Sequence, residues 1–362
     1  MSKYVVLGGY LGAGKTTGMI AFAEALRARG KQAAILVNDL GTKHLVDGST
    51  TEAAGCCYDE VTGDCICYQT AELVDKLRLF RDSSGAEIIF SDIPGCGIGA
   101  LDHVYHRLAK NYPGEFTLCP FTAVADPERL RALMPEHAEL HLPAEMGFLF
   151  DAQLKEAELI LLNKVDTLTP ERRDECLDFL RGRYPQAVVL PMSARTGEGV
   201  DAVVDYLLSA ESALPNPDIG YGSRAFAAAE KRLCWYDRKC YVRRRDCSPL
   251  DADAFAADLF EAIRARLAEA ERNVPHLKLF ARGSDGFLKA SLLGIDYPVE
   301  YDHRFTGPQK ELRIVLNARA ACESEVLDFL MDAALREVCQ KHELLLRVFF
   351  TECFGMMDEG RD

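Results

Sequence analysis

The sequence predicts an α/β domain with a mostly parallel sheet, followed by a smaller α+β domain. Over about the first two hundred residues, short apolar runs alternate with segments of helical periodicity, a pattern typical of a parallel sheet with helices on both faces. Proline and glycine are then concentrated at 214–224, which indicates a linker. We therefore expect one domain at 1–213 and a second at 225–362.

Each expected strand of the first domain is a short run of aliphatic residues, and each expected helix has apolar residues at helical spacing. The strands are placed at 4–7, 32–38, 87–92, 116–125, 158–163 and 187–192, and the helices at 18–29, 71–81, 170–184 and 199–208. In the second domain, strands are expected at 226–243, 276–282, 287–293, 311–317 and 344–350, and helices at 251–272 and 321–342. This order predicts an antiparallel sheet with two helices on one face.

The segment Gly-Gly-Tyr-Leu-Gly-Ala-Gly-Lys-Thr-Thr at 8–17 fits the phosphate-binding loop G-x-x-x-x-G-K-[ST], and it lies between an expected strand and an expected helix. Glycines allow successive backbone N–H groups to surround phosphate oxygens at a helix N-terminus. Lys15 would contact the β- and γ-phosphates, and the Thr16 hydroxyl would ligate Mg²⁺. The residues expected to contact nucleotide here are Gly9, Gly12, Ala13, Gly14, Lys15, Thr16 and Thr17.

Asn163-Lys164-Val165-Asp166 follows an expected strand and predicts a guanine site. The Asp166 carboxylate can accept from both N1–H and the exocyclic amine of guanine, whereas adenine would leave it unpaired. Asn163 would support the base edge, and the stem of Lys164 would pack on its face. Ser193-Ala194-Arg195, after a later strand, resembles the GTPase loop whose alanine N–H meets guanine O6. Together these motifs favour GTP over ATP.

Two segments between these motifs are candidate switches. The first is Val37-Asn38-Asp39-Leu40-Gly41, continuing to Val46-Asp47-Gly48, and we count Asp39 among the nucleotide-binding candidates. The second is Asp92-Ile93-Pro94-Gly95, at the end of an apolar strand. Asp92 would hold Mg²⁺ through water, and the Gly95 N–H would contact the γ-phosphate. With Lys15 and Thr16, these two residues form the expected catalytic set.

A cysteine cluster lies between the switches, with Cys56 and Cys57 followed by Cys65 and Cys67. Thiolates are soft ligands that suit Zn²⁺, Co²⁺, Ni²⁺ or Fe²⁺. Two sulfurs of a C-x-C sequence cannot complete a tetrahedron, so Cys56, Cys57 and Cys96 are further candidates. The alternative is that these are small buried cysteines.

Composition and net charge narrow the class of protein further. The 362 residues carry a net charge of −14, which disfavours nucleic-acid and anionic-membrane partners. No signal-peptide pattern and no apolar run long enough to span a membrane is present, so we expect a cytoplasmic protein. In that compartment, 13 cysteines indicate thiols or metal ligands rather than disulfides.

The phosphate loop, the Asn-Asp-Leu-Gly switch, the Gly-x-Cys-Ile-Cys cluster and the segment 153–166 together resemble the CobW-like GTPases, which belong with HypB, UreG and MeaB. The resemblance covers about the first 210 residues and implies a GTPase that helps to load metals or metallo-cofactors into target enzymes. Three departures stand out. Tyr68 replaces the third cysteine of the family's C-x-C-C, Asp92 replaces a common glutamate, and Asp39 replaces the glutamate of an Asn-Glu pair.

The resemblance implies a GTP-hydrolysing metallochaperone with Mg²⁺, GTP or GDP, and a transition metal, Zn²⁺ or Co²⁺ before Ni²⁺ or Fe²⁺. Its partner would be a client metalloenzyme or corrinoid protein, and a nucleotide-dependent homodimer is common among such relatives. One alternative is a GTP-dependent reactivator of a corrinoid (cobalamin) enzyme that transfers no metal. Another is a binding module that selects partners by its GTP state.

Overall fold

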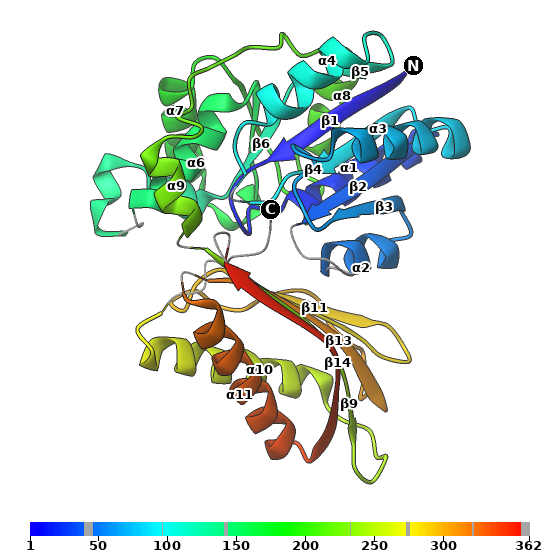
Figure 1. Cartoon of the computed structure of the whole chain (residues 1–362), viewed down its shortest axis with the longest axis vertical. Coiled ribbons are helices and arrows are strands. Elements are labelled where there is room, and N and C mark those ends of the chain that lie inside the picture. Colours follow the sequence, from blue (N-terminus) through cyan, green and yellow to red (C-terminus); the bar gives the residue numbers. More distant parts are fainter. Residues whose placement is uncertain are drawn as a thin grey trace. The chain divides into compact units, whose positions relative to one another are not determined.

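The computed structural model describes residues 1–39, 46–95, 97–140, 144–231, 233–272, 276–320 and 322–355. The chain forms two compact units (Figure 1). The first comprises Met1–Lys43 and Thr51–Ala229, and the second comprises His44–Thr50 and Glu230–Asp362. In the described part of the chain, no helix is both long and apolar enough to cross a bilayer.

The first unit is built on a parallel sheet in which β3, β2, β4, β1, β6, β7 and β8 follow one another, with β5 also paired to β1. The strands are β1 (Ser2–Gly8), β2 (Ala33–Asp39), β3 (Cys57–Thr62), β4 (Ile88–Asp92), β5 (Phe116–Leu118), β6 (Thr122–Ala125), β7 (Leu159–Leu162) and β8 (Val188–Pro191). This confirms the predicted parallel α/β architecture.

Helices connect these strands. They are α1 (Lys15–Ala28), α2 (Val46–Ala53), α3 (Thr70–Leu79), α4 (Arg107–Asn111), α5 (Pro127–Arg131), α6 (Ala144–Glu156), α7 (Pro170–Arg183), α8 (Val200–Ser209) and α9 (Arg224–Lys231). Shorter or non-α turns are η1 (Phe80–Ser84), η2 (Leu101–His106), η3 (Pro135–Leu140) and η4 (Val165–Thr167). The local sequence determines where α7 begins. The side chain of Thr169 accepts from the Arg172 N–H and caps the helix, and Pro170 occupies its first turn.

The core of the first unit explains why β1 lies at its centre. Val5 and Leu7 of β1 are fully buried and belong to one apolar cluster with Phe22 of α1 and Val203 of α8. Tyr4 and Val6, which alternate with them onto the other face of the sheet, are fully buried as well. Burial on both faces is what a continuous aliphatic strand predicts. The strand therefore delivers the loop that follows it to a fixed point at the carboxyl edge of the sheet.

Two expected elements were wrong in detail. The strand expected at 116–125 is divided into β5 and β6, because Pro120 cannot donate to a sheet ladder. The strand expected at 226–243 begins later, since α9 precedes it. Its alanine-rich sequence Arg-Ala-Phe-Ala-Ala-Ala-Glu-Lys favours a helix.

The second unit contains an antiparallel sheet in the order β12, β11, β10, β13, β9, β14, as predicted for this part of the chain. Its strands are β9 (Cys234–Arg244), β10 (His276–Arg282), β11 (Phe287–Leu292), β12 (Glu300–His303), β13 (Glu311–Ala320) and β14 (Leu344–Gly355). The helices α10 (Ala252–Glu269) and α11 (Ser324–Lys341) share one apolar core with this sheet.

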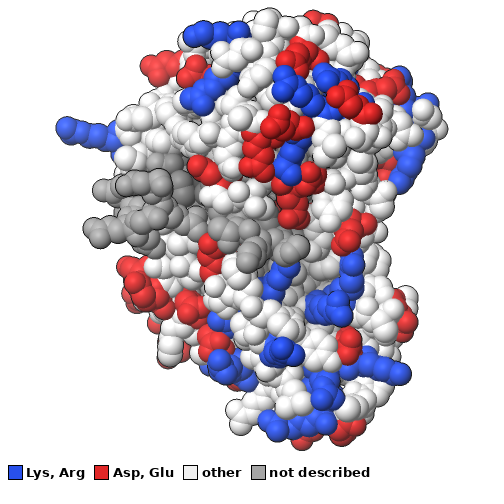
Figure 2. All heavy atoms as spheres, turned by 45° about the vertical axis from the view of Figure 1, so that its right-hand side comes forward, with Lys and Arg blue, Asp and Glu red and all other residues white. Residues whose placement is uncertain are grey.

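Acidic and basic side chains are interspersed over the described surface on the face drawn in Figure 2. The excess of acidic over basic residues is 14, from 56 and 42 respectively. On this face, the charges therefore form a mixed surface rather than a field of one sign.

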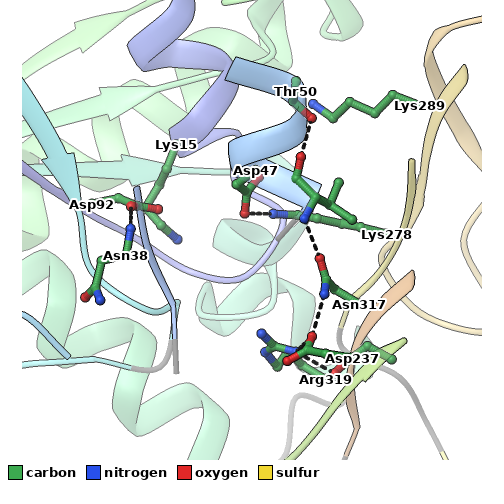
Figure 3. Close-up of polar contacts among 12 residues, drawn as sticks. Lys15, Asn38, Asp47, Thr50, Asp92, Asp237, Lys278, Lys289, Asn317 and Arg319 are labelled. Carbon is green, nitrogen blue, oxygen red and sulfur yellow. Dashed lines mark hydrogen bonds and ion pairs between the residues drawn. The ribbon is translucent and has the colours of Figure 1, made fainter. Parts of the chain in front are cut away.

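Residues 46–50, the first part of α2, belong to the second unit. The Asn317 side-chain oxygen of β13 accepts from the Val46 N–H at 2.8 Å, and Lys278 of β10 pairs with Asp47 (Figure 3). Asn317 also donates to the buried Asp237 carboxylate of β9. A polar network within the C-terminal sheet thus fixes the start of α2.

Replacing Asn317 by alanine should lower the stability of the second unit by about 2 kcal/mol, because the Val46 N–H and the Asp237 carboxylate would each lose a buried partner. The protein has one tryptophan, Trp235, which is buried in this unit and stacked on Phe354. Urea unfolding followed by tryptophan fluorescence therefore measures this unit. The exposed Asn111→Ala change is the control, and equal midpoints for the two variants would contradict the prediction.

Candidate nucleotide and metal site

The phosphate loop is fixed by close backbone approaches at two glycines. Gly9 has φ +122°, and a Cβ there would lie 2.3 Å from the Val124 carbonyl oxygen. Gly14 has φ +95° and is the N-cap residue that precedes α1. The Lys15 ammonium donates to the Gly9 carbonyl at 2.8 Å and so spans the loop. Such a loop, ahead of a helix N-terminus, is suited to polyphosphate. Of the other residues predicted to contact nucleotide, Gly12 and Ala13 lie on the loop, and Thr16 and Thr17 lie in the first turn of α1.

The second switch begins beside this loop. Asp92 ends β4, pairs in register with Leu7 of β1, and is 4% exposed (Figure 3). A Cβ on Gly95 would lie 2.6 Å from the Leu11 side chain, so Gly95 packs directly against the phosphate loop. The buried Thr16 hydroxyl and the Asp92 carboxylate lie at the same edge of the sheet. Oxygen ligands of these kinds fit Mg²⁺.

Asn163 connects the two nucleotide-binding loops. Its amide nitrogen donates to the Ala13 carbonyl at 2.8 Å, and its oxygen accepts from the Ala194 N–H at 3.0 Å. A Cβ on Gly14 would lie only 2.4 Å from the same amide nitrogen. We expected Asn163 to support the base edge. Its amide bonds backbone groups of both loops and so positions the loops that would surround the base, while its second N–H leaves the predicted base contact untested.

Lys164 and Asp166 lie on the turn after β7. Lys164 adopts φ +60°, and its ammonium pairs with the buried Asp126 carboxylate at 2.9 Å, which fixes the direction of its stem. Burial opposes ionisation of Asp166, but hydrogen bonds from Ser193 and Arg195 outweigh it and hold the pKa of this carboxyl below its ordinary value. The carboxylate is therefore ionised at neutral pH, as an acceptor for two guanine donors must be.

Cys65 and Cys67 form a close thiol pair. Their sulfurs are 2.7 Å apart, both side chains are buried, and the Cys67 N–H donates to the Cys65 sulfur at 3.3 Å. The hydrogen bond with Cys67, followed by burial, raises the pKa of the Cys65 thiol well above its usual range. A cation would have to displace these protons, so its affinity would rise with pH.

Of the other predicted thiols, Cys56 and Cys57 are described, and neither joins this pair. Cys57 is the first residue of β3, and the strand extends about 16 Å from it to Thr62 at 3.3 Å per residue, whereas Cys65 lies on the turn after Thr62. Cys56 precedes Cys57 and packs against the apolar core. Cys96 and the side chain of Asp39 lie outside the described residues. Within the described ranges, no three His, Cys, Asp or Glu side chains are grouped to hold a metal ion.

Tyr68, at the position of the family's third cysteine, is 56% exposed, and its hydroxyl contacts that of Tyr221. His103 lies with its ring 4.6 Å from that of Tyr221, and Arg107 bonds both the His103 Nδ1 and the Cys67 carbonyl. Burial lowers the pKa of His103, so the ring is neutral at physiological pH. These aromatic and basic groups border the thiol pair.

Sequence reasoning missed the structural role of Asn38, which is 3% exposed at the end of β2. Its N–H donates to Asp92 Oδ1 at 2.9 Å (Figure 3). Its amide nitrogen donates to the carbonyls of Val61 and Asp64, and its amide oxygen accepts from the Ile66 N–H. Only the tertiary structure reveals that one side chain binds the turn carrying the thiols.

Helix α6 contacts the end of the second switch and the residues that follow it. The buried Gln153 amide donates to the carbonyls of Gly95 and Gly97, at 3.0 Å each. One turn further on, the Glu156 carboxylate accepts from the N–H groups of Gly99 and Leu101, at 2.8 and 2.6 Å. Both residues lie in the segment that contributed to the sequence resemblance, but nothing in the sequence indicated these contacts.

The β1–loop–α1 arrangement and the parallel sheet define a P-loop nucleotide-binding domain. Residues 3–190 match the family described as CobW/HypB/UreG, nucleotide-binding domain. The chain belongs to this family, which confirms the resemblance inferred from its motifs.

Individual relatives are more distant. The zinc chaperone CobW of a Sinorhizobium species is 29% identical over 218 residues, 55% of this chain and 60% of that protein. The hydrogenase maturation factor HypB of Cupriavidus necator is 39% identical over 75 residues, 20% of this chain and 21% of that protein. The chain thus spans about three fifths of the first relative and one fifth of the second. Zn(II)-bound YjiA GTPase from E. coli is 14% identical, with a TM-score of 0.37, covering 93% of this chain and 98% of that chain.

Burial raises the pKa of Glu156 from 4.5 to about 7. Between these values the folded protein retains a proton that the unfolded chain releases, so the free energy of unfolding should fall by about 3 kcal/mol as pH rises from 4.5 to 7. The change Glu156→Gln should remove this component. Denaturant unfolding of both proteins across this range measures it, with the exposed Glu24→Gln change as control. A constant difference between wild type and Glu156→Gln would contradict the assignment.

Proposed function

We propose that this protein is a GTP-hydrolysing metallochaperone that binds a transition metal at Cys65 and Cys67 and delivers it to a client metalloenzyme or cofactor pathway. One observation carries the proposal. The two buried thiols, 2.7 Å apart, lie on the turn after β3. The side chain of Asn38 bonds this turn at the Asp64 carbonyl, and the backbone N–H of Asn38 donates to Asp92 Oδ1. Nucleotide and thiol residues are thus connected through direct hydrogen bonds.

Hydrolysis uses the residues already described. Backbone N–H groups of the phosphate loop and Lys15 hold the β- and γ-phosphates, and Asp166 selects guanine. Water attacks the γ-phosphorus, the bond to the β-phosphate oxygen breaks, and GDP and phosphate leave. Thr16 and, through water, Asp92 would hold Mg²⁺, which would neutralise charge on the phosphate oxygens. Loss of the γ-phosphate frees the Gly95 N–H, so the second switch can move.

The metal is proposed to be Zn²⁺ or Co²⁺, with Ni²⁺ and Fe²⁺ as alternatives, because all four accept thiolates. The name zinc chaperone carried by the Sinorhizobium relative supports zinc. Two thiolates hold such an ion incompletely, and its remaining ligands would come from water, from residues outside the described ranges or from the client. Incomplete coordination suits an ion that must leave again. A client metalloenzyme would take it up, and a nucleotide-dependent homodimer is a further expected partner.

One observation favours a second candidate, a GTP-dependent reactivator of a corrinoid enzyme that transfers no metal. Within the described residues, no third protein ligand is grouped with Cys65 and Cys67. Tyr68 occupies the position at which the family commonly has one. A reactivator would use the same GTP cycle to open and close its contacts with the enzyme.

An anaerobic Co²⁺ titration, read by the cobalt–thiolate charge-transfer band, separates the two candidates. Replacing Cys65 and Cys67 together by serine should abolish the band and weaken binding at least 100-fold, since both soft ligands are lost. The matched Cys56→Ser/Cys57→Ser protein should retain it, because these thiols lie at the other end of β3. Absence of the band in wild type would overturn metal delivery and leave the reactivator.

The change Asp166→Asn tests the base. An amide in place of the carboxylate presents a donor to the guanine N1–H or amine, so GTP should bind about 100-fold more weakly. Xanthosine triphosphate offers a carbonyl at the position of the guanine amine and should bind the variant better than it binds wild type. Fluorescent-nucleotide competition measures both affinities, and unchanged GTP affinity would refute the assigned guanine contact.

A further inference from the structure

Asn38 links the catalytic carboxylate to the turn that carries the thiols. Its backbone N–H donates to Asp92 Oδ1 at 2.9 Å. Its side chain bonds the Val61 carbonyl at 3.1 Å, the Asp64 carbonyl at 2.9 Å and the Ile66 N–H at 3.0 Å. Through these four bonds, β2 connects the end of β4 with the turn that follows β3.

The contacts hold Cys65 on both sides. The Asp64 carbonyl belongs to the peptide group before Cys65, and the Ile66 N–H belongs to the one after it. The Cys65 sulfur is in turn close to the Cys67 sulfur and N–H. A displacement of Asn38 would therefore move the peptide groups that fix the orientation of the first thiol relative to the second.

We propose that Asn38 is the positioning residue that couples the nucleotide state to metal affinity at Cys65 and Cys67. This inference rests on the metallochaperone function proposed above. When the second switch moves on hydrolysis, Asp92 shifts, and the bond from its carboxylate to Asn38 transmits the shift to the Cys65–Cys67 turn. The sulfurs then change their separation, and the ion is held more weakly. The reciprocal effect follows, since metal binding would change nucleotide affinity by the same factor.

The chemistry of this position requires asparagine. The side chain must donate to two carbonyls and accept from one N–H at the same time, which one primary amide does. An aspartate would place a carboxylate against the Val61 and Asp64 carbonyls. A leucine would fill the volume but leave all three backbone groups without their partner.

The test measures Co²⁺ affinity in the presence of GDP and of a non-hydrolysable GTP analogue, for wild type and for Asn38→Ala. The ratio of the two affinities should be tenfold or more in wild type and should fall below twofold in the variant. A merely structural role would lower both affinities and leave their ratio unchanged. The matched control is Gln186→Ala. Its amide also donates to two carbonyls, those of Leu154 and Lys155, and its removal should preserve the wild-type ratio.

The outcomes distinguish failure of the role of Asn38 from failure of the proposed metallochaperone function. A wild-type ratio near one would overturn the coupling and, with it, GTP-driven metal transfer. A tenfold ratio that survives Asn38→Ala would overturn the role of Asn38 alone. Should the variant fail to fold, amide hydrogen exchange on the wild type replaces it. The Asn38 and Ile66 N–H groups should change protection together between the two nucleotides, and unchanged protection at both would refute the inference.

Discussion

The parallel alignment of β1 with β4 and of β4 with β2 is the constraint on which the site depends. Parallel strands end at one edge, and here that edge receives the phosphate loop after β1, Asp92 at the end of β4 and Asn38 at the end of β2. Because all three strands are buried among aliphatic side chains, a one-residue slip would expose apolar surface and separate the three groups. The packing of these strands in the hydrophobic core thus fixes the positions of the polar groups relative to one another.

The sequence was sufficient where chemistry is local. The phosphate loop and Asn163-Lys164-Val165-Asp166 are contiguous motifs whose strand context could be identified from apolar runs, and the architecture of both units followed from the same patterns. It was insufficient where partners are distant along the chain. Gln153 contacts Gly95 across 58 residues, and Asn38 contacts Asp92 across 54. Contacts over such separations follow neither helical nor strand periodicity, so they could not be predicted from the sequence.

The cysteines show the opposite error, in which nearness in sequence was mistaken for nearness in space. Cys57 and Cys65 are eight positions apart, but an extended strand lies between them and separates them by most of its length. That strand was not expected, because Cys-Tyr-Asp-Glu-Val-Thr has little aliphatic content and is only partly buried at the edge of the sheet. A strand held by backbone pairing at a sheet edge gives a weak hydrophobic signal.

The assignment of residues 46–50 to the second unit has a consequence for biosynthesis. The Val46 N–H is bound by a side chain 271 residues later in the chain. At about 5–20 residues per second, a ribosome needs roughly 15–50 s to add those residues. During that interval the nascent nucleotide domain can form its central strands, but Val46 and Asp47 lack the partners that Asn317 and Lys278 later provide. Anchoring of the start of α2 would therefore be a late event of synthesis, and a chain released early would lack it.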